Sequence, residues 1–103
     1  MQTLEEENRQ VLNLLQALLG AVSANFRAVS INCQDTIVLN VVLGEDRAED
    51  REEIDDIEFE FLAQQSRPVS VSTEVLVSSR PIEELRLPGR LVFLRREPAS
   101  VSP

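Results

Sequence analysis

The stretch RAVSINCQDTIVLNVVL, residues 27–43, holds two runs of alternating side chains and decides the fold. In residues 27–34 every second side chain is apolar, as expected for a β-strand with one buried face: Val29, Ile31 and Cys33. Residues 36–43 are apolar on both faces, which is typical of a strand inside a sheet or under a covering layer. Only residues 34–36 remain for the connection, so we expect a tight β-hairpin.

Upstream of the hairpin, residues 3–22 predict an amphipathic helix. Thr3 is a good N-cap, and Glu6 stands three residues later at the capping-box position. Helical spacing places one set of apolar residues on a common face, namely Leu4, Val11, Leu15, Leu18 and Val22, widened by Leu12 and Leu19. We expect this face to pack on the core, although a Leu-rich seam also suits contact with a second subunit.

Downstream, residues 46–65 predict a second helix. Asp46 is the candidate N-cap, with Glu49 at the capping-box position. The spacing of Ile54, Ile57 and Phe61 buries one stripe of a helix. The alternation within residues 57–61 also fits a strand, but the Glu-rich run before it has no strand character and contains no Gly or Pro. In the helix, Phe59 falls off the buried stripe and is expected to be exposed.

The remaining chain predicts two more strands. Residues 69–78 alternate cleanly between apolar and polar side chains, the pattern of a sheet with one face in water. Residues 79–89 form a loop with a helical turn expected at Pro81, and residues 90–96 form the last strand. We expect a single domain over residues 1–97 and a disordered tail over residues 98–103.

The predicted element order is α-β-β-α-β-β. It indicates an α+β domain with a four-stranded, mainly antiparallel sheet and both helices on one face. Two strand arrangements remain open, a circularly permuted ferredoxin-like sheet and a plain meander. Either way we expect one shared core, formed by Leu15, Leu18, Ile37, Leu39, Val41, Ile54, Phe61, Val71 and Val75.

Charge is concentrated in one segment. The chain has 103 residues, 18 acidic and 10 basic, with a net charge of −8. Residues 45–60 hold ten acids and two arginines, so they carry the whole net charge while the rest of the chain is balanced. The excess of acidic over basic residues argues against direct binding of nucleic-acid phosphates.

The residue types argue against catalysis and metal binding. The chain has no His, and its basic residues are all Arg, so a Ser or Thr nucleophile has no ordinary base. Residues 50–56 lack the Gly turn of a calcium loop. We therefore expect no catalytic residues, no metal site and no cofactor. Cys33 has no partner for an internal disulfide and is expected to be buried and unreactive.

The acidic segment admits two interpretations, a solvated helix face or a docking surface for a basic protein domain. Many like charges on one helix repel one another, and a cationic partner would relieve that repulsion. Under the second interpretation the predicted partner-binding residues are Glu49, Asp50, Glu53, Asp56, Phe59 and Glu60. The chain shows neither a long apolar run nor a secretory signal, so we expect no membrane contact and a cytoplasmic location.

Three segments resemble small bacterial immunity proteins that neutralise polymorphic or contact-dependent toxins. They are NLLQALLGAVSANF (13–26), EDREEIDDIEFEFLAQ (49–64) and PGRLVFLRR (88–96). The resemblance implies a cytoplasmic, non-catalytic protein that binds and blocks one cognate toxin domain. If that toxin is a nuclease, an acidic helix could take the place of the phosphate backbone. The alternative function is a structural or assembly protein that forms a homo-oligomer, for example a homodimer, through strand edges or the Leu-rich helix.

Overall fold

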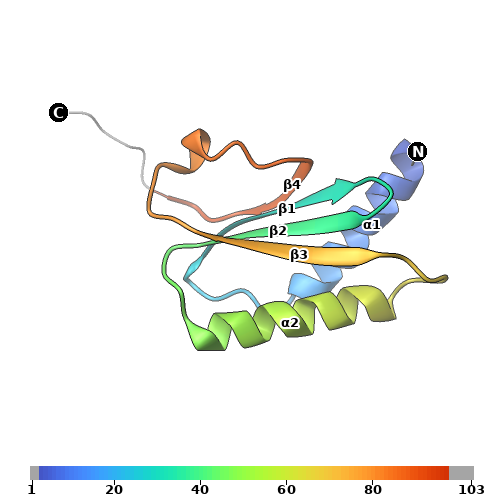
Figure 1. The fold of residues 1–103 in the computed structure, drawn as a ribbon, viewed down its shortest axis with the longest axis horizontal. Helices are drawn as coiled ribbons and strands as arrows, with labels where there is room; N and C mark the ends of the chain where they lie inside the picture. Colours follow the sequence, from blue (N-terminus) through green and yellow to red (C-terminus); the bar gives the residue numbers. More distant parts are fainter. Residues whose placement is uncertain (1–2, 98–103) are drawn as a thin grey trace.

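In the computed structural model, which describes residues 3–97, two helices and four strands follow in the predicted order (Figure 1). The elements are α1 (Leu4–Leu18), β1 (Phe26–Cys33), β2 (Ile37–Leu43), α2 (Ala48–Ala63), β3 (Val71–Val77), the 3₁₀ turn η1 (Ile82–Glu84) and β4 (Arg90–Leu94). The helical prediction for the acidic segment and the turn after Pro81 are confirmed. The predicted tail, residues 98–103, lies outside the described residues.

The sheet has the strand order β3-β2-β1-β4 and is mainly antiparallel, as predicted. β1 pairs antiparallel with β2 and with β4, whereas β2 and β3 run parallel and are joined through α2. Both proposed strand arrangements are wrong. A ferredoxin-like sheet inserts a strand between the parallel strands of a β-α-β unit, but β2 and β3 are direct neighbours. A meander would place β4 beside β3.

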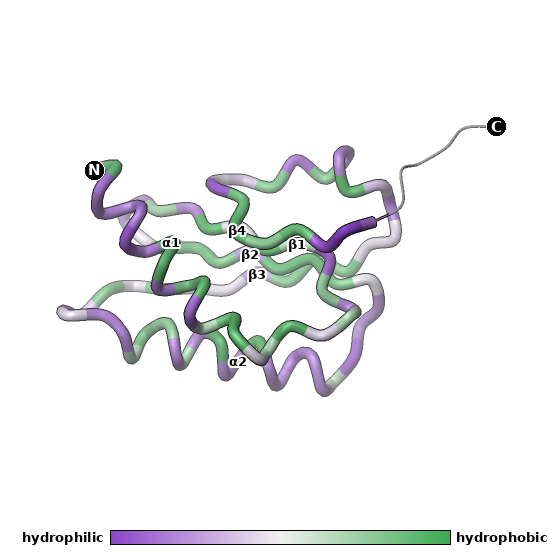
Figure 2. The backbone as a smooth tube through the Cα atoms, turned by 180° about the vertical axis from the view of Figure 1, so that it is seen from behind, coloured by the Kyte–Doolittle hydropathy of each residue, from purple (hydrophilic) through white to green (hydrophobic). Residues whose placement is uncertain are grey.

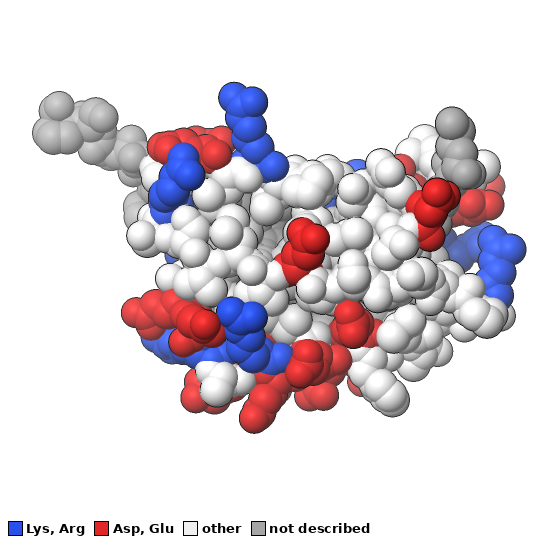
Figure 3. All heavy atoms as spheres, in the orientation of Figure 1, with Lys and Arg blue, Asp and Glu red and all other residues white. Residues whose placement is uncertain are grey.

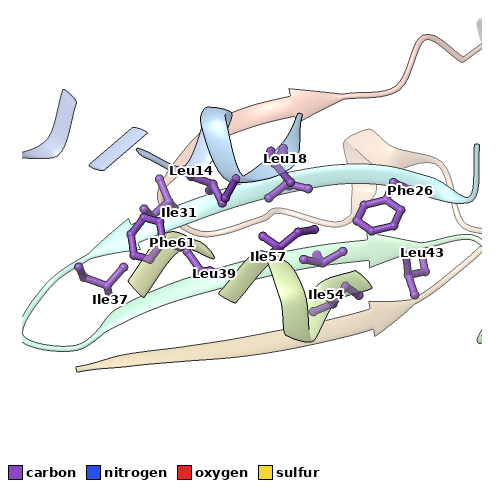
Figure 4. Packing of buried hydrophobic residues seen from close by; sticks show 13 residues of the cluster. Leu14, Leu18, Phe26, Ile31, Ile37, Leu39, Leu43, Ile54, Ile57 and Phe61 are labelled. Atoms are coloured by element: carbon purple, nitrogen blue, oxygen red, sulfur yellow. The ribbon is translucent and has the colours of Figure 1, made fainter. Parts of the chain in front are cut away.

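The core lies between the sheet and the two helices, which share one sheet face (Figure 4). Leu14 and Leu18 of α1 and three residues of α2 meet the alternating side chains of β1 and β2. The α2 residues are the predicted stripe of Ile54, Ile57 and Phe61, all at most 4% exposed. Figure 2 shows the apolar residues gathered along the inner strands and the acidic helix as mostly hydrophilic.

The predicted buried face of α1 is only partly correct, because Leu18 is buried and Val11 and Val22 pack against the core, but its other leucines are exposed. Leu15 is 41% exposed and Leu12 is 65% exposed, whereas Leu14 is fully buried. The helix is rotated so that Gln10, Leu14, Ala17 and Leu18 face inward. Gln10 tolerates burial because its side-chain amide exchanges two hydrogen bonds with the amide of Gln65, at 2.8 and 2.9 Å.

The prediction that one face of the sheet is exposed to solvent is only partly correct. On β3 it is exposed, but over β1 and β2 the segment 78–88 forms a second layer. Arg27 donates hydrogen bonds to the carbonyl oxygens of Ser78 and Arg80, at 2.8 and 2.7 Å. The layer ends at Gly89, which has a φ of +79°, and an added Cβ there would lie 2.1 Å from the Ile31 carbonyl oxygen.

Three local predictions have mixed outcomes. Thr3 caps α1, with its Oγ1 accepting a 3.1 Å bond from the Glu6 amide. Asp46 does not cap α2, because its carboxylate pairs with Arg51 at 2.9 Å and Arg47 holds the cap position without a side-chain bond. Cys33 is the last residue of β1 and only half-buried; burial raises the pKa of its thiol. None of the helices in residues 3–97 has the length and apolar character to cross a membrane.

Candidate functional site: an acidic face and a groove on α2

The two arginines of the acidic segment are bound to the acids that precede α2. Arg47 pairs with Glu45 at 2.6 Å, and Arg51 pairs with Asp46 at 2.9 Å. Both arginines donate side-chain hydrogen bonds to these carboxylates, which raises their pKa values. Both arginines therefore neutralise Glu45 and Asp46, which precede α2, and the acids of α2 itself keep their negative charge.

Asp50 is not part of the solvent face, contrary to prediction. Its side chain is buried, with the residue only 4% exposed. The reason is helical spacing, because residue 50 stands four positions before Ile54 and seven before Ile57, on the same buried stripe. Apolar periodicity alone missed it, although the same spacing applied to polar residues would have found it.

The buried Asp50 carboxylate is held by two neutral donors. Ser23 donates through its hydroxyl at 2.7 Å, and Asn25 donates through its amide nitrogen at 2.8 Å. The Asn25 side chain also donates a 2.7 Å hydrogen bond to the Glu45 carbonyl oxygen and accepts a 2.9 Å hydrogen bond from the Glu45 backbone N–H. These bonds join the start of β1, the end of β2 and the first turn of α2. They fix the direction in which α2 presents its outer face.

Six other acids of α2 are exposed, and none of them forms an ion pair within residues 3–97. Four were predicted, and the other two belong to the same outer surface although the prediction omitted them. We call this set the acidic face; it consists of Glu49, Glu52, Glu53, Asp55, Asp56 and Glu60. Figure 3 shows acidic side chains gathered along this helix. Glu58 differs, because its carboxylate accepts a 2.7 Å bond from the Thr73 hydroxyl.

Part of the acidic face borders a groove of about 270 Å³ between α2 and the end of α1. Four predicted residues line it, namely Glu53, Asp56, Phe59 and Glu60, while Glu49 lies outside it. From the α1 side it is lined by residues that the sequence did not suggest, among them Gln16, Leu19 and Gly20. Leu19 is 79% exposed and Phe59 is 73% exposed, so two large apolar side chains stand at its rim. We call this feature the α1–α2 groove.

Within residues 3–97 no cluster of three or more acidic, His or Cys side chains could hold a metal ion. Carboxylates, an amide and two apolar side chains can bind a protein surface, but they do not form a nucleophile with its base. The arrangement therefore favours recognition of a partner.

The small α+β domain thus exposes an acidic face that has no ion pair within residues 3–97, which suits a partner-binding protein. The family model described as MafI2 immunity protein matches residues 7–97, which include all four strands. Because the match covers most of the chain, the protein belongs to the MafI2 immunity protein family. The resemblance to small immunity proteins is thus confirmed. A search of curated proteins found no match.

Proposed function

We propose that this chain is a non-catalytic immunity protein that neutralises one cognate bacterial toxin by covering a basic surface of the toxin domain with the acidic face. Membership of the MafI2 immunity protein family supports the toxin as partner. The observation that carries the proposal is the set of six exposed carboxylates on α2 without an ion pair within residues 3–97.

The charge of the acidic face is suited to rapid capture of a cationic partner. Six carboxylates on one short helix repel one another, so binding of a basic surface relieves a cost that the free protein carries. Complementary charge also speeds association and selects against acidic partners. A nuclease is the toxin class that suits this face best, because its substrate site is cationic and an acidic helix can occupy the place of the phosphates.

The place of action that we propose is the cytoplasm, since the lone half-buried Cys33 requires no oxidising compartment. A second candidate function is self-association through α1, favoured by the exposed side chains of Leu12 and Leu15. Sedimentation at rising salt distinguishes the two, because salt strengthens apolar self-association and weakens contact between opposite charges.

The test uses the candidate cognate toxin domain, which is to be identified among the genes neighbouring that of this chain. The variant E49K/E53K/D56K reverses three exposed charges and leaves the buried Asp50 intact. We expect stopped-flow association to slow at least tenfold at low salt and to lose most of its salt dependence. Co-expression with the toxin should then no longer protect cells. If the variant folds by circular dichroism yet binds with an unchanged rate and salt slope, the acidic face is only a solvated surface.

A further inference from the structure

The α1–α2 groove combines exposed carboxylates with exposed large apolar side chains. Glu53, Asp56 and Glu60 offer carboxylate oxygens without an ion pair within residues 3–97. Leu19 and Phe59 add apolar surface at the rim, and both are more than 70% exposed. Exposed apolar side chains at a concave, charged place are typical of a contact site.

The groove is also open on its α1 side. Gly20 follows the end of α1 with a φ of +80°, and a Cβ built at this residue would meet no atom within 4 Å. Gln16 lines the same side and contributes an amide oxygen as a further acceptor. The groove of about 270 Å³ leaves room for a long side chain between α1 and α2.

We infer that the α1–α2 groove receives one arginine side chain of the toxin, which rests on the proposed function but assigns it a specific contact. The methylene groups of an arginine would pack against Leu19 and Phe59, and its guanidinium would reach the carboxylates. The guanidinium carries five N–H donors in a planar fork, which suits several carboxylate oxygens at once. It also packs face to face on an aromatic ring such as Phe59.

Other occupants match the groove less well. An apolar or aromatic side chain would bury the rim but leave three carboxylates without a partner in a drier environment. A lysine supplies the charge but neither the fork nor the flat surface that stacks on Phe59. The arginine is expected to govern how long the complex lasts, whereas the wider acidic face governs how quickly it forms.

The experiment compares matched pairs of substitutions in the full chain, with the cognate toxin domain used in the test of the proposed function. L19A/F59A removes the apolar rim, and L62A/L94A removes two exposed leucines elsewhere. E53Q/D56N neutralises two groove acids, and E52Q/D55N neutralises two acids of the same helix outside the groove. We expect L19A/F59A to raise the dissociation rate at least tenfold and its control less than twofold. E53Q/D56N should raise it at least fivefold more than E52Q/D55N.

A double-mutant cycle then identifies the occupant. Each surface arginine of the toxin is replaced by Ala and measured against the native chain and against E53Q/D56N. One arginine should lose most of its effect in the variant, and replacing it by Lys should not restore binding. Equal effects of the groove and control pairs, or coupling to a lysine or an apolar residue, overturn the arginine contact while the proposed function stands. A native chain that does not bind the toxin overturns both.

Discussion

The two faces of the sheet are covered in different ways. The front face, on which α1 and α2 pack, meets the helices mainly through apolar side chains that form the buried core, and the Thr73 hydroxyl of β3 also donates a hydrogen bond to Glu58 of α2. Over β1 and β2 the back face is covered by residues 78–88, which contain only the short turn η1 as regular structure, and polar contacts attach this segment. The back of β3 is exposed. Arg27 and Ser30 donate to backbone carbonyl oxygens there. Apolar periodicity therefore predicts the front of this domain and the burial of Val42 on the back, whereas long-range hydrogen bonds determine which segment covers the back.

The front face should show the largest effect on stability. Leu14 of α1 and Leu39 of β2 are both fully buried. L14A and L39A should therefore each lower the free energy of unfolding by about 2–5 kcal/mol. L15A is the control, because Leu15 is 41% exposed, and it should cost about 1 kcal/mol or less. Urea unfolding checks all three. An L15A effect as large as that of L14A would contradict the observed rotation of α1.

The difference between α1 and α2 shows what periodicity could and could not decide. In α2 only Ile54, Ile57 and Phe61 are both apolar and correctly spaced, so the buried stripe was predicted correctly. In α1 leucines lie around most of the helix, and several stripes of similar quality exist. The choice among them depends on Gln10, whose partner Gln65 is 55 residues away. No local pattern contains that information.

The same limit applies to the candidate site. The acidic face was evident from charge counting, because exposure of charged residues is the default. The burial of Asp50 depends on Ser23 and Asn25, which are 27 and 25 residues away. The α1 side of the groove, with Leu19 and Gly20, arises only when the end of one helix is placed beside the other. Sequence can therefore predict the charge of this surface but not its concave part.

The back face should respond to acid. Arg27 donates two hydrogen bonds to Glu97, at 2.9 and 2.8 Å, and together with Arg95 it lowers the pKa of that carboxyl to about 2. A depressed carboxyl pKa contributes stability above the unfolded value of 4.5, and this contribution is lost as the pH falls toward 2. E97Q should lower the free energy of unfolding at pH 7 by about 3 kcal/mol, because it leaves the buried Arg27 charge uncompensated.

The matched control for E97Q is E84Q, since the Arg80–Glu84 pair is exposed on both sides. Its effect should be at most about 0.5 kcal/mol. Thermal or urea unfolding from pH 7 to pH 2 gives both results. If E97Q keeps the full acid sensitivity of the native chain between pH 4.5 and 2, the Arg27–Glu97 contact does not hold the back layer.

The smallest expected change in stability comes from two neighbouring residues on the back face, whose substitutions should act in opposite directions. They test whether hydrogen bonds attach residues 78–88 to the sheet. Ser30 and Asn40 are paired across β1 and β2, and both are buried on the back face. Ser30 donates a 2.9 Å bond to the Pro88 carbonyl oxygen, whereas the Asn40 amide nitrogen has no partner within the described chain. S30A should therefore lower the free energy of unfolding by about 1 kcal/mol. N40L has a similar shape and removes the unpaired donor, so it should raise that free energy by about 1 kcal/mol. Urea unfolding of both variants provides the measurement. Destabilisation by N40L would mean that the amide is paired in solution, for example by a trapped water molecule.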